Sequence, residues 1–180
     1  MEKRLKNIKF VAVLAMLAAI SIICGKYLAI NVGEFMRFSL ENMPIIFAGV
    51  AFGPVAGAVV GIVADLVGCV MVGWVPIPLV TVGAAAIGAI SGGVSLLITK
   101  TALPSWLKTV ITLSCAHFIG SVMIKTIGLA GFYDIPYTIL MLWRMLNYLI
   151  VGIIDGVVIH ILMKNKGIRL QIKEIGGKEQ

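Results

Sequence analysis

The chain has 180 residues, of which 60% are hydrophobic and only 13% are charged, and its mean hydropathy is +1.07. Soluble domains of this length are about half apolar and a quarter charged, so this much apolar surface does not fit inside one soluble core. The composition therefore predicts an integral protein of the cell membrane. The net charge of +7 does not indicate nucleic-acid binding, because the basic residues lie beside apolar segments and not on an amphipathic soluble surface.

Six apolar segments, interrupted at Gly, Pro or charged residues, predict membrane helices over residues 8–25, 43–53, 55–73, 79–99, 107–131 and 137–163. The expected fold is an all-α bundle of about six transmembrane helices, which forms one domain over residues 1–180. The second segment is too short to cross a bilayer alone, and Pro54 fits the first turn of the next helix. These two segments therefore predict a tight helical hairpin.

The basic residues indicate how the bundle is oriented. An even number of spans places both termini on one side of the membrane, and eleven of the fifteen Lys and Arg residues fall on that side. They are Lys3, Arg4, Lys6, Lys9, Lys100, Lys108, Lys164, Lys166, Arg169, Lys173 and Lys178. By the positive-inside rule we predict that both termini are cytoplasmic. Residues 26–42, 73–78 and 132–136 then form outer loops that can act as a lid.

Four basic residues remain outside or within the membrane, where a charged group points to a cavity or a pathway. They are Lys26, Arg37, Lys125 and Arg144. Lys125 and Arg144 fall in the outer halves of the fifth and sixth predicted helices, and Asp65 falls near the middle of the third. We expect an outward-facing pocket that is lined by cations and has an acid at its floor. The alternative is that Lys125 and Arg144 only pair with Asp65 or extend toward the water.

The sixth predicted helix carries a mixed aromatic and polar face. Tyr137, Met141, Arg144 and Tyr148 recur at helical spacing, and Asn147 lies one position aside. An arginine can form paired hydrogen bonds with a carboxylate, and a tyrosine offers a flat apolar ring with one hydroxyl group. This face therefore suits a planar ligand that is partly anionic.

The apolar segments also contain His117, Asp155 and His160. Neither histidine has a glutamate or a second histidine at metal-ligand spacing, so the sequence predicts no metal site. Asp155 lies toward the cytoplasmic side, where we expect it to pair with a neighbouring helix. An intramembrane enzyme that uses a histidine as a base beside Asp155 is an alternative, but the polar groups are sparse and no metal motif supports it.

Small residues one helical turn apart let helices approach closely in lipid. Three such rows occur, formed by Ala15 and Ala19, by Gly57 and Gly61, and by Ala84, Gly88 and Gly92. We expect the two glycine rows to pack within the bundle. Ala15 and Ala19 lie on the helix that opens the chain, where they either pack internally or form a smooth face that admits another protein.

A family resemblance is carried by RFSLENMPIIFAGVAFGP at residues 37–54 and by ADLVG at residues 64–68. The leading arginine, the A-G-x-x-F-G-P turn and the A-D-L-x-G segment are similar to those of the substrate-binding S components of energy-coupling-factor (ECF) transporters. The folate-specific branch resembles the chain most, and the length and the short second helix also agree. Residues 72–81 and the end of the fifth helix depart from that branch.

The resemblance implies a membrane protein that captures a vitamin from outside and joins a transmembrane coupling protein and two cytoplasmic ATPases. Ala15 and Ala19 match the A-x-x-x-A motif through which such families contact the coupling protein. The first outer loop, at about residues 26–42, is implied to act as a gate with the other outer loops. The sequence itself contains no Walker-type phosphate loop, so ATP hydrolysis is expected of the partners and not of this chain.

The leading hypothesis is the binding and uptake of folate or a related pterin, with no cofactor and no enzymatic activity. A flat ring needs aromatic partners, a glutamate tail needs cations, and an acid can accept hydrogen bonds from the N–H groups of the ring. The residues expected to supply these contacts are Trp74, Tyr137 and Tyr148 for the ring, Arg37, Lys125 and Arg144 for the tail, Asp65 for the N–H groups, and Asn147 beside them.

Two further alternatives remain open. Another small anionic vitamin, such as pantothenate, would use the cations but leave the aromatic residues without a role. A stand-alone secondary carrier would be driven by an ion gradient, but the sequence shows neither a clear inverted repeat nor a pair of matching broken helices.

Overall fold

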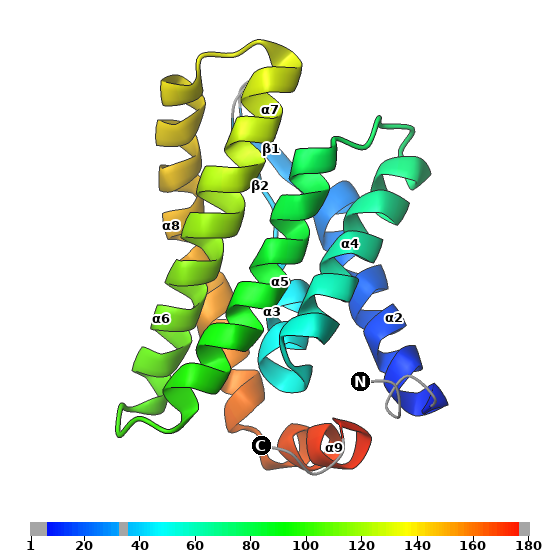
Figure 1. Ribbon diagram of the computed structural model, residues 1–180, viewed down its shortest axis with the longest axis vertical. Helices are drawn as coiled ribbons and strands as arrows, with labels where there is room; N and C mark the ends of the chain where they lie inside the picture. Colours follow the sequence, from blue (N-terminus) through cyan, green and yellow to red (C-terminus); the bar gives the residue numbers. More distant parts are fainter. Residues whose placement is uncertain (1–6, 33–35, 177–180) are drawn as a thin grey trace.

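The computed structural model describes residues 7–32 and 36–176, which form a helical bundle (Figure 1). The helices are α2 (Ile8–Ile22), η1 (Ile23–Tyr27), α3 (Asn42–Phe52), α4 (Pro54–Met71), α5 (Pro78–Thr99), α6 (Ser105–Ala116), η2 (His117–Lys125), α7 (Thr126–Tyr133), α8 (Tyr137–Lys164) and α9 (Lys166–Gly176). The labels η1 and η2 mark π-helical turns that continue the helix before them. The all-α membrane fold expected from the sequence is confirmed.

Five helical stretches in the described part of the chain are long and apolar enough to cross a membrane. They are Ile8–Tyr27, Pro54–Met71, Pro78–Thr99, Ser105–Tyr133 and Tyr137–Lys164. The remaining apolar segment is α3, which is helical but too short to cross. The ends of these six helical stretches lie within two residues of the bounds that the hydropathy pattern predicts.

The short helix α3 and the long helix α4 form a tight hairpin. Helix α3 has 11 residues, which corresponds to about 16 Å of helix and about half of the bilayer core. Gly53 joins the two helices with a φ angle of 99°, a value that favours glycine, and Pro54 begins α4 without leaving a backbone donor unpaired. Ile45, Ile46 and Ala48 are at most 1% exposed, so the bundle surrounds α3.

Helices α4 and α5 approach each other at backbone distance. A Cβ atom on Gly57 would lie 2.5 Å from the carbonyl oxygen of Gly88, and a Cβ atom on Gly92 would lie 2.5 Å from the nitrogen of Pro54. Neither position has room for a side chain. The glycine rows therefore pack within the bundle, as their spacing predicts.

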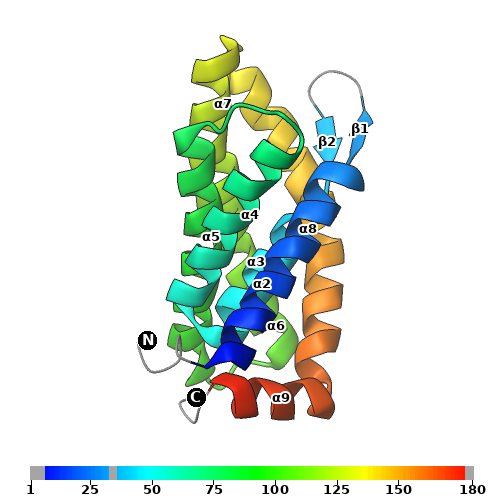
Figure 2. The same ribbon diagram turned by 90° about the vertical axis from the view of Figure 1, so that its right-hand side faces the viewer.

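The two ends of the bundle differ in structure. At the end that we call the hairpin end, β1 (Ile30–Val32) and β2 (Met36–Phe38) pair antiparallel, with Asn31 opposite Arg37, near the α7–α8 connection (Figures 1 and 2). The sequence predicted this segment only as a loop, because strands of three residues are too short to show a periodic pattern. At the opposite end, the terminal end, α2 begins and α9 ends (Figure 2). Lys3, Arg4, Lys6 and Lys178 lie outside the described residues.

Helix α9 crosses the terminal end of the bundle, where the sequence predicted only a basic segment (Figure 2). The side-chain oxygen of Asn165 accepts a hydrogen bond from the backbone nitrogen of Gly167 at 2.9 Å and so caps the start of this helix. Ile172 and Ile175 pack against the core cluster that contains Phe52. The helix was missed because its apolar residues alternate with polar ones and do not form the long apolar run that marks a membrane span.

Candidate ligand-binding site

A partly buried ion pair lies among the polar residues near the hairpin end, with the Lys125 side chain 4% exposed and the Glu41 side chain 21% exposed. Lys125, at the end of η2, places Nζ 2.9 Å from Oε1 of Glu41, and Nζ also lies 3.4 Å from Oδ1 of Asn42. Asn42 in turn donates a hydrogen bond to Ser121 at 3.3 Å. The sequence predicted that Lys125 binds a ligand anion or pairs with Asp65, but its ion-pair partner is Glu41.

Glu41 was not among the predicted site residues. Its position directly before the short helix α3, within the segment that carries the family motif, is the signal that could have identified it. A Cβ atom on Gly25 would lie 2.6 Å from Oε2 of Glu41, so the glycine leaves room for the carboxylate. Ser21 donates a hydrogen bond to the backbone oxygen of Glu41 at 2.7 Å. The start of α3 is thus tied to α2 and η1 as well as to η2.

The charge of Glu41 is stabilised by several cations. Burial raises the pKa of its carboxyl group, but the charges of Lys125, Lys26 and Arg37 and the hydrogen bond from Lys125 outweigh burial and hold the pKa at about 2. Glu41 is therefore an anion at any physiological pH. The ammonium group of Lys125 is already paired with it and does not stand free for a ligand.

Arg37 and Trp74, two of the predicted site residues, lie together. The guanidinium carbon of Arg37 is 4.6 Å from the centre of the Trp74 ring, and Nζ of Lys26 is 4.8 Å from the same ring. Arg37 also donates a hydrogen bond to the backbone oxygen of Gly25. The tryptophan, on the α4–α5 connection, therefore joins that loop to η1 and to β2.

The polar face of α8 contacts the same hairpin. Asn147 donates a hydrogen bond to the backbone oxygen of Arg37 at 2.6 Å, and Arg144 donates one to the hydroxyl group of Tyr148 at 2.9 Å. The Tyr148 ring stacks on His117, with ring centres 5.0 Å apart. The structure thus brings together four of the predicted site residues, Arg37, Arg144, Asn147 and Tyr148.

Three buried polar atoms of this group have no hydrogen-bond partner among the described residues. They are Nε of Arg37, Nε of Arg144 and Oδ1 of Asn147. A buried polar atom left unpaired costs about 1–3 kcal/mol, more when it belongs to a charged group. The site therefore presents two cationic donors and one amide acceptor that a ligand can satisfy.

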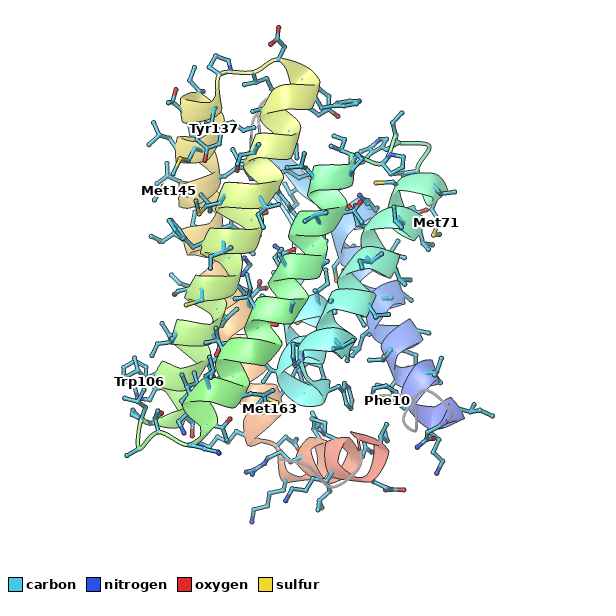
Figure 3. The ribbon with its side chains drawn as sticks, in the orientation of Figure 1. Phe10, Met71, Trp106, Tyr137, Met145 and Met163 are labelled. Carbon is cyan, nitrogen blue, oxygen red and sulfur yellow. The ribbon has the colours of Figure 1, made fainter. Side chains whose placement is uncertain are left out.

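Two predicted site residues, Asp65 and Tyr137, form no hydrogen bond with these residues in the described part of the chain. Asp65 is 5% exposed and accepts a hydrogen bond from the hydroxyl group of Thr81 at 2.6 Å, across the α4–α5 contact. Tyr137 is the first residue of α8 and lies near the hairpin end of that helix, above Met145 (Figure 3). Tyr137 therefore lies beside the outer edge of the polar residues and not among them.

Helix α2 presents the two alanines that the sequence singled out. Ala15 and Ala19 are both exposed, whereas Ala18 on the same helix is 4% exposed and packs in the core. The alternative that Ala15 and Ala19 pack inside the bundle therefore does not fit the structure. Their face of α2 remains open to another helix.

His117 and Asp155 form a second buried pair, deeper in the bundle. His117 Nε2 lies 3.2 Å from Oδ2 of Asp155, which agrees with the expectation that Asp155 pairs with a neighbouring helix. Beside this pair, a groove of about 750 Å³ runs between α6–η2 and α8. Tyr148 and His117 line it, but most of its lining is apolar, and it does not include Arg37 or Arg144. The groove therefore lacks the two arginines that the sequence assigned to an anionic ligand.

Comparison with known proteins identifies the family. The family model of the ECF transporter, substrate-specific component, matches residues 9–164. No curated protein matches the chain in sequence.

Three solved structures share the fold. A crystal structure of FolT bound with folic acid superimposes with a TM-score of 0.69 at 20% identity, covering 86% of this chain and 92% of that one. The structure of the S component of a bacterial ECF transporter superimposes with a TM-score of 0.66 at 17% identity, covering 87% of this chain and 94% of that one. The crystal structure of the S component for biotin from an ECF-type ABC transporter superimposes with a TM-score of 0.66 at 19% identity, covering 92% of this chain and 96% of that one.

These identities show the fold and leave the ligand open, because relatives with different ligands match about equally well. The family match, in contrast, covers most of the chain and agrees with the resemblance that the sequence motifs carry. The chain therefore belongs to the substrate-specific components of ECF transporters, and it is a multi-pass membrane transport subunit and not an enzyme.

Proposed function

We propose that this substrate-specific component binds folate or a related pterin. The observation that carries the proposal is a set of three buried atoms without a partner among the described residues, Nε of Arg37, Nε of Arg144 and Oδ1 of Asn147. The guanidinium group of Arg37 also lies over the ring of Trp74. Two guanidinium donors favour a carboxylate, and an amide oxygen favours an N–H donor. Folate supplies a carboxylate tail, N–H groups and a flat ring in one molecule.

Each predicted residue has a role in this proposal. Arg37 and Arg144 hold the carboxylate, and Trp74 and Tyr148 contact the flat ring. Asn147 accepts a hydrogen bond from an N–H group of the ligand.

Asp65 is a second acceptor, because Thr81 occupies only one of its two carboxylate oxygens. Tyr137 covers the mouth of the site. Lys125 acts indirectly, since its ammonium group holds Glu41 and thereby positions the start of α3.

A second candidate is a smaller anionic vitamin, such as pantothenate. It is supported by the similarity to the S component for biotin, whose TM-score is close to that of FolT. Such a ligand would use the two arginines but not the ring of Trp74. The two candidates therefore differ in how much binding depends on the aromatic residue.

In the same proposal the chain delivers its ligand through a transmembrane coupling protein that two ATPases energise. The exposed face of α2 at Ala15 and Ala19 supports this assignment, because small side chains let a partner helix approach at backbone distance.

Calorimetry on the purified full-length protein tests the ligand. We expect folic acid to bind more tightly than biotin or pantothenate. Trp74→Ala should weaken the affinity for folic acid by about tenfold or more, since stacking on an aromatic ring contributes roughly 1–3 kcal/mol. Trp143→Ala is the matched control, because Trp143 is a half-exposed residue of α8 outside the polar group. Binding of biotin or pantothenate at least as tight as that of folic acid would reject the pterin and favour the second candidate.

A further inference from the structure

Helix α9 has a distinct inner face. Ile172 and Ile175 pack against the core, and Ile168 is half-buried, so the isoleucines three and four residues apart mark the side that touches the bundle. The helix contacts α2, α3 and α8. It is therefore a fixed part of the terminal end and not a free tail.

The outer side of α9 is basic. Lys166, Arg169 and Lys173 are spaced by three and four residues, so they fall on one side of the helix, and all three are exposed. None of them forms an ion pair with a residue that the structure describes. Leu170 lies among these cations and is 67% exposed. We call these four residues the basic face of α9.

The position of α9 along the bundle places this face near the membrane surface. A single residue, Asn165, separates α9 from the end of α8, so the chain turns aside as soon as the last membrane helix ends. Trp106, which is 58% exposed, lies at the same end of the bundle (Figure 3). Exposed tryptophans collect at the level of the lipid headgroups, so α9 lies across the bundle at or just beyond that level.

We propose that the basic face of α9 binds the headgroups of anionic phospholipids. Three cations that form no ion pair within the described ranges attract a negatively charged surface, and the distribution of Lys and Arg predicts that this end is cytoplasmic. Leu170 favours lipid over an acidic protein surface or free phosphate, because an apolar side chain among cations fits the boundary between headgroups and acyl chains. This surface lies outside the ligand site, so the proposal goes beyond the proposed function and does not depend on it.

Lipid retention measured by native mass spectrometry on the full-length protein tests the proposal. We expect phosphatidylglycerol to be retained in preference to phosphatidylcholine. The double variant Arg169→Gln with Lys173→Gln should weaken phosphatidylglycerol binding by roughly fivefold for each cation removed, or about 25-fold. The control variant, Lys9→Gln with Lys100→Gln, loses the same amount of charge from exposed positions outside α9. This variant should bind the lipid as tightly as the unmodified chain does.

A second variant separates the binding surface from the folding of α9. Leu170→Asn keeps every charge and should also reduce phosphatidylglycerol retention, while Arg169→Lys with Lys173→Arg should preserve it. Hydrogen exchange of the α9 amides reports whether the helix stays folded. If the charge-removing variant unfolds α9, phosphatidylglycerol retention by Leu170→Asn decides whether the basic face binds the lipid.

Equal retention of the two lipids, or equal loss in the α9 and control variants, overturns the proposal. Unchanged lipid retention combined with loss of copurifying transporter subunits would assign the basic face to a protein instead.

Discussion

The ammonium group of Lys125 lies 2.9 Å from the carboxylate of Glu41, although the two residues are 84 positions apart in the chain. This pair joins the end of η2 to the start of α3 at the hairpin end of the bundle. Because Lys125 is paired with Glu41, we assign the anionic part of the ligand to Arg37 and Arg144, whose Nε atoms have no partner among the described residues.

Breaking the pair from one side should destabilise the protein. Lys125→Met leaves the partly buried carboxylate of Glu41 without its principal cation, so we expect the free energy of unfolding to fall by about 3 kcal/mol. Adding Glu41→Gln to this variant removes the unpaired charge and should recover part of the loss. Thermal unfolding of the two single variants and the double variant measures the coupling. A Lys125→Met protein as stable as the unmodified chain would contradict the assignment.

Loss of either arginine should weaken ligand binding. Arg37→Ala and Arg144→Ala each remove a charge-assisted hydrogen bond in a site shielded from water, which contributes roughly 1.5–3 kcal/mol. We therefore expect the Kd for folic acid to rise by about tenfold or more in each variant. Tyr148→Phe removes only the hydroxyl group that Arg144 contacts and should have a smaller effect. Folic acid binding that is unchanged in both arginine variants would rule out the carboxylate clamp.

Acid should destabilise the protein through Glu41. Its pKa is lowered from the ordinary 4.5 of a glutamate to about 2, so the charged form stabilises the folded state above pH 4.5 and this stabilisation is lost as the pH falls toward 2. The difference in melting temperature between the unmodified protein and Glu41→Gln should therefore shrink over this pH interval. The comparison removes the effects of other acids, which titrate in both proteins. A difference that stays constant from pH 6 to the acid limit would show that the Glu41 charge contributes nothing.

The chain alone should bind its vitamin but should not accumulate it. The sequence holds no nucleotide-binding loop, so vesicles that contain only this protein should reach equilibrium with the medium. Concentration of the ligand should require ATP together with the coupling protein and the ATPases. Concentrative uptake without partners would favour the secondary-carrier alternative.

Bulky residues on the exposed face of α2 should separate transport from binding. Ala15→Trp with Ala19→Trp should abolish recovery of the partner subunits in a pull-down, because a partner helix can no longer approach closely. Ligand affinity of the isolated protein should survive, since both alanines are exposed and lie away from the polar group. Full recovery of the partners would remove these residues from the docking surface, and loss of ligand binding as well would indicate damage to the bundle.

The sequence by itself determined the membrane class, the helical segments and the α3–α4 hairpin. These features are local: apolar runs of sufficient length must be helical in a bilayer, and Gly53 followed by Pro54 separates one helix from the next. The motif around Arg37 and Asp65 also sufficed to indicate the family. The spacing of Arg144, Asn147 and Tyr148 in the sequence also identified them as one face of α8, because helical periodicity alone places them together.

Only the tertiary structure decided which of these groups meet. Asn147 bonds the backbone of Arg37 from 110 positions away, and Lys125 pairs with Glu41 rather than with Asp65, which bonds Thr81. Such partners depend on how far each helix is rotated and shifted against its neighbours, and hydropathy carries no information about either quantity. The packing of α9 across the terminal end has the same origin, because its isoleucines are buried only once α2, α3 and α8 form the surface that receives them.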